Sequence, residues 1–189
     1  MKRMMRVLML VSLVAMLACD ARRPEDSNEA AEEANEDKFT ENDSEKDADF
    51  VADLVAANYE EIKLAQVARQ RSADTQVKEI ASLLETQHAK QLNDLKALAA
   101  SKSISVPVEE DDGARNRIKK ISDETQNFDE KWCKEQIDGH EDMISDLEAR
   151  KDNTEDEDLK AWIDKVLPEM RSHLDKVKAC HERIKDANG

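Results

Sequence analysis

The chain has 189 residues and a formal net charge of −15 at pH 7, with 44 acidic and 29 basic side chains. Such acidity argues against nucleic acid or bare anionic lipid as a partner, because both require a basic face on the protein. The sequence contains only three glycines and three prolines. It is long enough for one domain with a substantial core.

The first 18 residues have the organisation of a secretory signal peptide. The opening MKRMMR carries three positive charges and precedes an apolar run, residues 7–17. A helix needs roughly 20 apolar residues to cross a bilayer, so this run is too short for a transmembrane span. We therefore expect an exported protein that faces the periplasm or is attached to the outer membrane.

A cysteine follows this apolar run directly. Residues Met16-Leu17-Ala18-Cys19 resemble a bacterial lipobox, in which a peptidase cleaves before a lipid-modified cysteine. Leucine is usual at the position of Met16. Lipid chains on Cys19 would make the membrane a partner, since several acyl chains together hold a protein firmly. The alternative is an ordinary cleaved signal with an unmodified Cys19.

Residues 20–49 read as an acidic linker. They contain 13 acidic and four basic side chains and almost no apolar ones. A segment of this composition buries too little apolar surface to offset the conformational entropy lost on ordering. We therefore expect residues 19–49 to form a lipid attachment point followed by a disordered, solvated tether. Cation binding by its carboxylates is the alternative role.

From residue 50 to 189 the sequence predicts a helical domain. Strong helix formers dominate it, and apolar residues recur at helical spacing. Capping-box patterns begin at Asn127 and at Thr154. The predicted long helices cover about 47–71, 75–100, 128–151 and the segment that follows Thr154.

The connections between these helices predict their arrangement. Short polar turns near 72–74 and 152–153 favour two antiparallel hairpins. The stretch 101–126 is longer and includes Pro107 and a short helix over 114–122; it either crosses the length of the bundle or folds back. We predict an all-α, ferritin-like four-helix bundle of two antiparallel hairpins with a long connection between them.

Cysteines and histidines share a register on the last two long helices. Cys133 precedes His140 by seven residues, and His173 precedes Cys180 by seven, so the histidines face each other if the cysteines meet. A turn centred near residue 153 separates the cysteines by about 10 Å along the axis, too far for a disulfide. A break at Pro168 or a lopsided turn would close this gap. Cys133 and Cys180 are therefore either a disulfide or two buried thiols.

Polar residues on the apolar faces are candidate metal ligands. Glu61, His88 and His140 fall near the middle of the predicted bundle, and His173 lies nearer the end of its helix. Glutamate and histidine together suit zinc or iron. The alternative is that these are core histidines, each hydrogen-bonded to a neighbour such as Asn58.

A complete di-iron site is not encoded. Glu85 and His88 have the Glu-x-x-His spacing that di-iron bundles use twice, but Glu169 and His173 are one residue too far apart for the second copy. The sequence also shows no Ser-His-Asp order, glycine-rich phosphate loop or CxxC motif, so we predict no enzyme. Cys133 and His140 are about 10 Å apart along one helix and cannot act as nucleophile and base.

Four stretches resemble an exported bacterial family filed as domain of unknown function 4142. They are EIKLAQVARQRSADTQVKEIA (61–81), QHAKQLNDLKALAASKSISVP (87–107), NFDEKWCKEQIDGHE (127–141) and LPEMRSHL (167–174). The resemblance implies a ferritin-like bundle, often labelled a predicted outer membrane protein, and no established reaction. The family's Asp-His pairs map onto Gln87-His88 and Gly139-His140, so both aspartates are replaced here.

Together these features predict a lipid-anchored protein of the cell envelope with a non-catalytic binding, structural or stress-related role. Its protein partner is not indicated. The alternative is a ferritin-like metal-binding protein that holds iron or zinc through Glu61, His88, His140 and His173; no cofactor is established by the sequence itself.

Overall fold

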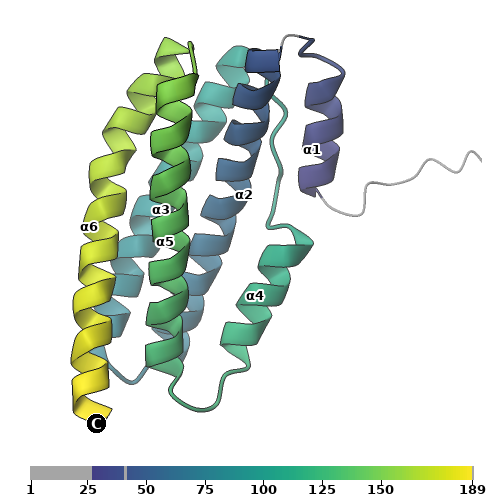
Figure 1. Ribbon diagram of the computed structural model, residues 1–189. Helices are drawn as coiled ribbons and strands as arrows, with labels where there is room; N and C mark the ends of the chain where they lie inside the picture. The colour runs from purple at the N-terminus through teal and green to yellow at the C-terminus, as the bar shows by residue number, and fades with distance from the viewer. Residues whose placement is uncertain (1–26, 41, 189) are drawn as a thin grey trace, which may run out of the picture.

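The computed structural model describes residues 27–40 and 42–188, and within these ranges the protein has six helices and no strand (Figure 1). The predicted signal peptide and Cys19 lie outside the described residues. Among the described residues, none of the helices combines the length and the hydropathy of a membrane-spanning segment. The helices are α1 Ser27–Glu36, α2 Asn42–Arg71, α3 Thr75–Lys102, α4 Asp112–Ser122, α5 Phe128–Asn153 and α6 Glu157–Asn188.

Four long helices lie side by side as a bundle, which confirms the all-α prediction (Figure 1). Helix α2 packs against α3, and α5 packs against α6, as two antiparallel hairpins. Contacts of α3 with α6 and of α2 with α5 join the hairpins. The short helix α4 lies against α2 and α5.

The connection between the hairpins runs along the bundle. Helix α3 ends at Lys102, and the C-cap Ser103, with a left-handed φ of 60°, turns the chain away from the helix axis. The chain then returns beside α2 to α4, and α5 begins at the opposite end of the bundle from the end of α3 (Figure 1). Helices α3 and α5 consequently run in the same direction.

The expectation of disorder over the acidic linker is wrong for residues 27–40 and 42–49. Ser27–Glu36 form α1, a turn follows, and residues 42–49 begin α2; Ala31 and Ala48 are buried. Asn35 is fully buried: its amide donates to the carbonyl oxygen of Ser105 at 3.0 Å and accepts from the Ser105 N–H at 2.8 Å. Composition could not reveal this pairing, in which one polar side chain satisfies the backbone of a distant loop.

Two helix starts also differ from the predicted capping boxes. Asn127 has a left-handed φ of 55°, and its side chain makes no capping bond within the described structure. At α6 the cap is Asp156, whose Oδ1 accepts the N–H groups of Asp158 and Leu159 at 3.0 Å. Thr154 instead donates to Asp47 of α2. The α6 cap, and with it the first residue of the helix, therefore lies two residues after the predicted position.

The core has an apolar cluster toward each end and a polar layer between them. One cluster includes Leu54, Leu95 and Met170, and the other includes Leu64, Leu84 and Trp132. The buried side chains of the intervening layer are Asn58, Glu61, His88, Gln91, Gln136, His140 and His173. Buried polar groups are costly unless they are paired, so this layer is where a functional site is expected.

Candidate metal centre

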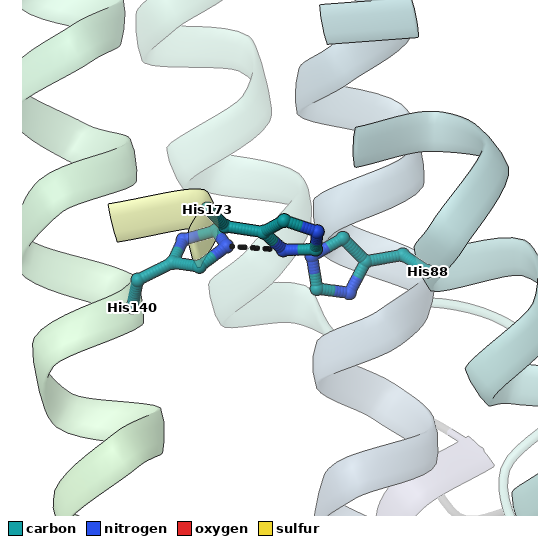
Figure 2. A group of neighbouring side chains, drawn as sticks. All are labelled: His88, His140 and His173. Atoms are coloured by element: carbon teal, nitrogen blue, oxygen red, sulfur yellow. Dashed lines mark hydrogen bonds between the residues drawn. The ribbon is translucent and has the colours of Figure 1, made fainter. Parts of the chain in front are cut away.

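Three helices each bring one histidine to the centre of the bundle (Figure 2). His88 of α3, His140 of α5 and His173 of α6 are at most 1% exposed. Their ring centroids are 5.3 to 5.5 Å apart. One ring nitrogen from each histidine lies within 4.8 Å of the other two, a grouping able to converge on a single cation.

The outer nitrogen of each ring faces an oxygen atom. His88 Nδ1 lies 3.0 Å from Oδ1 of Asn58, whose own amide donates to a backbone carbonyl, so the histidine is the donor. His140 Nδ1 donates to the carbonyl oxygen of Gln136 at 2.8 Å. His173 Nε2 donates to Oε1 of Gln87. These bonds place the proton of each neutral ring on its outer nitrogen.

The inner nitrogens are left with lone pairs that face one another. His140 Nε2 and His173 Nδ1 are 3.3 Å apart, joined by the dashed line in Figure 2. His88 Nε2 has no hydrogen-bond partner among the described residues. Two acceptors cannot hydrogen-bond to each other, but a cation between them satisfies both. Tetrahedral zinc with Zn–N bonds of about 2.0–2.1 Å separates its nitrogen ligands by about 3.3 Å.

Burial keeps all three imidazoles neutral. It lowers the pKa of His140 to about 4 and that of His173 to about 3. The pKa of His88 is lowered well below its usual value, first by burial and then by its two histidine neighbours. Neutral imidazole is the form that binds a metal, so the cluster is already in its ligating state at neutral pH.

Glu61, the fourth predicted ligand, lies apart from this group. It is buried on α2, but no oxygen of its carboxyl belongs to the set of atoms within 4.8 Å of one another. Burial raises the pKa of Glu61 to about 8. The nearby amide of Gln136 offsets part of this rise, although neither of its amide atoms makes a hydrogen bond of normal geometry to a described residue.

The other candidate carboxylates of a di-iron site point elsewhere. Glu85 accepts from Arg69 and from Gln66 of the adjacent helix α2. Glu169 accepts from Gln91 at 3.0 Å. The centre is therefore built from nitrogen ligands, with carboxylates outside it.

Sequence reasoning missed Gln87 as a supporting residue. It occupies a position where the resembling family has aspartate, directly before His88, yet it contacts His173 on another helix. An amide oxygen there performs the orienting role that a carboxylate would perform, because either group accepts the outer N–H. The family's Asp-His pattern could have indicated that this position supports a histidine. Only the packing of the helices shows that the supported histidine is His173.

Cys133 and Cys180 belong to the same core cluster, and both are buried, free thiols in the described structure. Helix α5 continues to Asn153, so the turn is centred two residues later than predicted, which closes much of the expected gap. The Cys133 thiol and then the nearby Arg183 guanidinium lower the pKa of Cys180. Hydrogen bonding to Cys180 and burial raise the pKa of Cys133.

The fold and the histidine cluster define an all-α bundle with a nitrogen-rich centre. A family model described as domain of unknown function (DUF4142) matches residues 29–180, and the chain belongs to this family. The resemblance seen in the sequence is therefore confirmed. The match begins inside α1 and ends at Cys180. No curated protein and no solved structure matches the chain.

Proposed function

We propose that this protein binds one divalent transition-metal ion through His88, His140 and His173 and has no catalytic role. The observation that carries the proposal is the polarity of the cluster: each ring donates outward to an oxygen and turns a lone pair inward. Metal-binding histidines in proteins are oriented in this way by second hydrogen bonds to carbonyls or carboxylates.

The donor set favours zinc over the iron that a ferritin-like bundle suggests. Imidazole ligands suit zinc, copper, nickel and iron, whereas magnesium, calcium and manganese prefer oxygen ligands. A carboxylate-bridged iron pair needs glutamates from several helices, and Glu85 and Glu169 are engaged elsewhere. The ligand proposed here is therefore a single zinc ion or an ion of similar preference.

A zinc titration of the metal-free protein tests this proposal. We expect one ion bound per chain and a rise in melting temperature with zinc concentration, because the ion binds the folded state. The double variant His88→Ala, His140→Ala should lose this binding. The matched control is His181→Ala, which removes the fourth histidine, a residue outside the cluster.

Two results would overturn the metal assignment. One is the absence of zinc binding by the wild-type protein, which would leave the histidines as packing residues. The other is unchanged binding in the double variant. Circular dichroism of each variant distinguishes a lost site from a lost fold, and His173→Asn provides a smaller change if the double variant does not fold.

We infer further that the fold is ferritin-like and that the chain is a lipoprotein of the cell envelope. Parallel α3 and α5, joined by a connection along the bundle, support the first inference. The signal-like N-terminus and the Met16–Cys19 sequence support the second. Mass spectrometry of the mature N-terminus tests the anchor: lipid on Cys19 is expected, and an unmodified Cys19 or cleavage elsewhere would refute it. Cys19→Ser should release the protein from membranes.

A further inference from the structure

A second candidate site lies away from the histidines, in a pocket of about 410 Å³ between α2 and α5. Arg117 of α4, which packs beside these helices (Figure 1), also lines it. The apolar part of the lining includes Phe50, Leu54 and Met143. The pocket therefore combines an aliphatic and aromatic surface with the charged groups described next.

Carboxylates dominate the charged lining. Seven of the lining side chains are aspartate or glutamate, and among the described residues the one cation is Arg117. The Arg117 guanidinium is already engaged, because it donates to both oxygens of Glu60 at 2.6 and 2.5 Å. The remaining carboxylates give the pocket a strongly negative potential that attracts a cation.

Glu61 supplies a buried acceptor in this pocket. The residue is 5% exposed, and its Oε2 has no hydrogen-bond partner in the described part of the chain. Gly139 on α5 gives the carboxyl its space, since a Cβ at that position would lie 3.3 Å from Oε1. A buried oxygen without a donor costs free energy that a ligand carrying N–H groups would recover.

The spacing of the carboxylates distinguishes between kinds of cation. Across the described residues, the group close enough to chelate a metal is the histidine cluster, and no three pocket carboxylates meet that criterion. Calcium requires six to eight oxygen ligands around one point. An extended organic cation instead contacts separate carboxylates along its length and covers the apolar wall with its methylene groups.

We propose that this pocket binds an aliphatic diamine or polyamine, with one ammonium group on Glu61 and the next on the other carboxylates that line the pocket. The methylene chain lies against Phe50, Leu54 and Met143. This inference does not depend on metal binding by the histidines, because none of the three lines the pocket.

Calorimetric titration of the full mature chain with spermidine tests the proposal. Glu61→Gln preserves the shape of the side chain and introduces no buried charge, so the variant is expected to fold. We expect its affinity for spermidine to fall about tenfold, because Glu61 gives up its proton to the solvent when the ammonium group binds and then makes one charge-assisted hydrogen bond that an amide cannot make. Glu155→Gln is the same substitution at an exposed turn outside the pocket and should bind spermidine like the wild type.

Three results would overturn the proposal. The first is no binding of spermidine by the wild-type protein. The second is an equal loss of affinity in Glu61→Gln and Glu155→Gln, which would indicate general attraction to an acidic surface. The third is displacement of spermidine by equimolar calcium chloride at about physiological ionic strength. That result would assign the pocket to a metal ion. Selective loss in Glu61→Gln without calcium displacement supports the amine site.

Discussion

His140 Nε2 and His173 Nδ1 face each other across 3.3 Å in the middle of the bundle. Each ring gives its outer N–H to an oxygen, so two lone pairs meet where a hydrogen bond would need a donor. Nε2 of His88 has no hydrogen-bond partner among the described residues and is a third acceptor nearby. Three inward-facing acceptors form the arrangement of nitrogen ligands that a cation requires.

Replacing Gln87 should weaken metal binding without removing a ligand. Gln87→Met keeps the size of the side chain but removes the oxygen that accepts from His173. Loss of such an orienting bond typically costs 10- to 100-fold in metal affinity, and we expect a change of about that size for zinc. Gln66→Met, which removes an amide bonded to Glu85, is the control and should change zinc affinity little. Equal zinc affinities in the two variants would contradict the role of Gln87.

The metal-free protein should lose stability as the pH falls from about 6.5 to 4. In this window the unfolded chain protonates its histidines, whereas the buried rings of His140 and His173 stay neutral until about pH 4 and 3. The stabilisation from these rings is therefore fully present above the histidine pKa of the unfolded chain. As the pH falls below that value, the free energy of unfolding declines by about 1.4 kcal/mol per pH unit for each buried histidine. Urea unfolding at pH 7, 6 and 5 measures this slope. A flat profile would show that the rings are not held neutral.

Glu61 should change the pH dependence of stability in the opposite direction, and at higher pH. Its pKa of about 8 in the folded state means that the folded chain holds a proton that the unfolded chain has lost above about pH 4.5. Stability from this group is present at low pH and declines as the pH rises toward 8. The decline between pH 6.5 and 8 should be absent in Glu61→Gln. Parallel urea unfolding profiles of the two proteins over this range would disprove the buried, protonated state.

Mild oxidation should link Cys133 to Cys180. In a Cys19→Ser background only these two thiols remain, and oxidised glutathione can take their two hydrogens and leave two molecules of reduced glutathione. The closed loop of about 48 residues would raise stability by about 4 kcal/mol at most, by limiting the unfolded chain. Thiol titration and thermal unfolding, with Cys180→Ser as the control, measure the result. Thiols that remain titratable after treatment would show that the pair cannot close.

The four long helices could be predicted from the sequence, because they depend on local periodicity, whereas α1 and the exact turn between α5 and α6 could not. Three of the four predicted metal residues indeed converge, since His88, His140 and His173 were correctly placed on inward faces. The separation of Glu61 could not be predicted, because it depends on how close α2 approaches α5 beside Gly139. The contact between Gln87 and His173, like that between Asn35 and Ser105, joins distant segments and leaves no local pattern in the sequence.

The measurement that tests the central claim most directly is the metal content of the protein purified without chelators. Elemental analysis should find about one zinc, or one ion of similar ligand preference, per chain in the wild type and in His181→Ala. The double variant His88→Ala, His140→Ala should contain none. Wild-type protein that is folded, carries no transition metal and takes up none from zinc-supplemented buffer would contradict the claim.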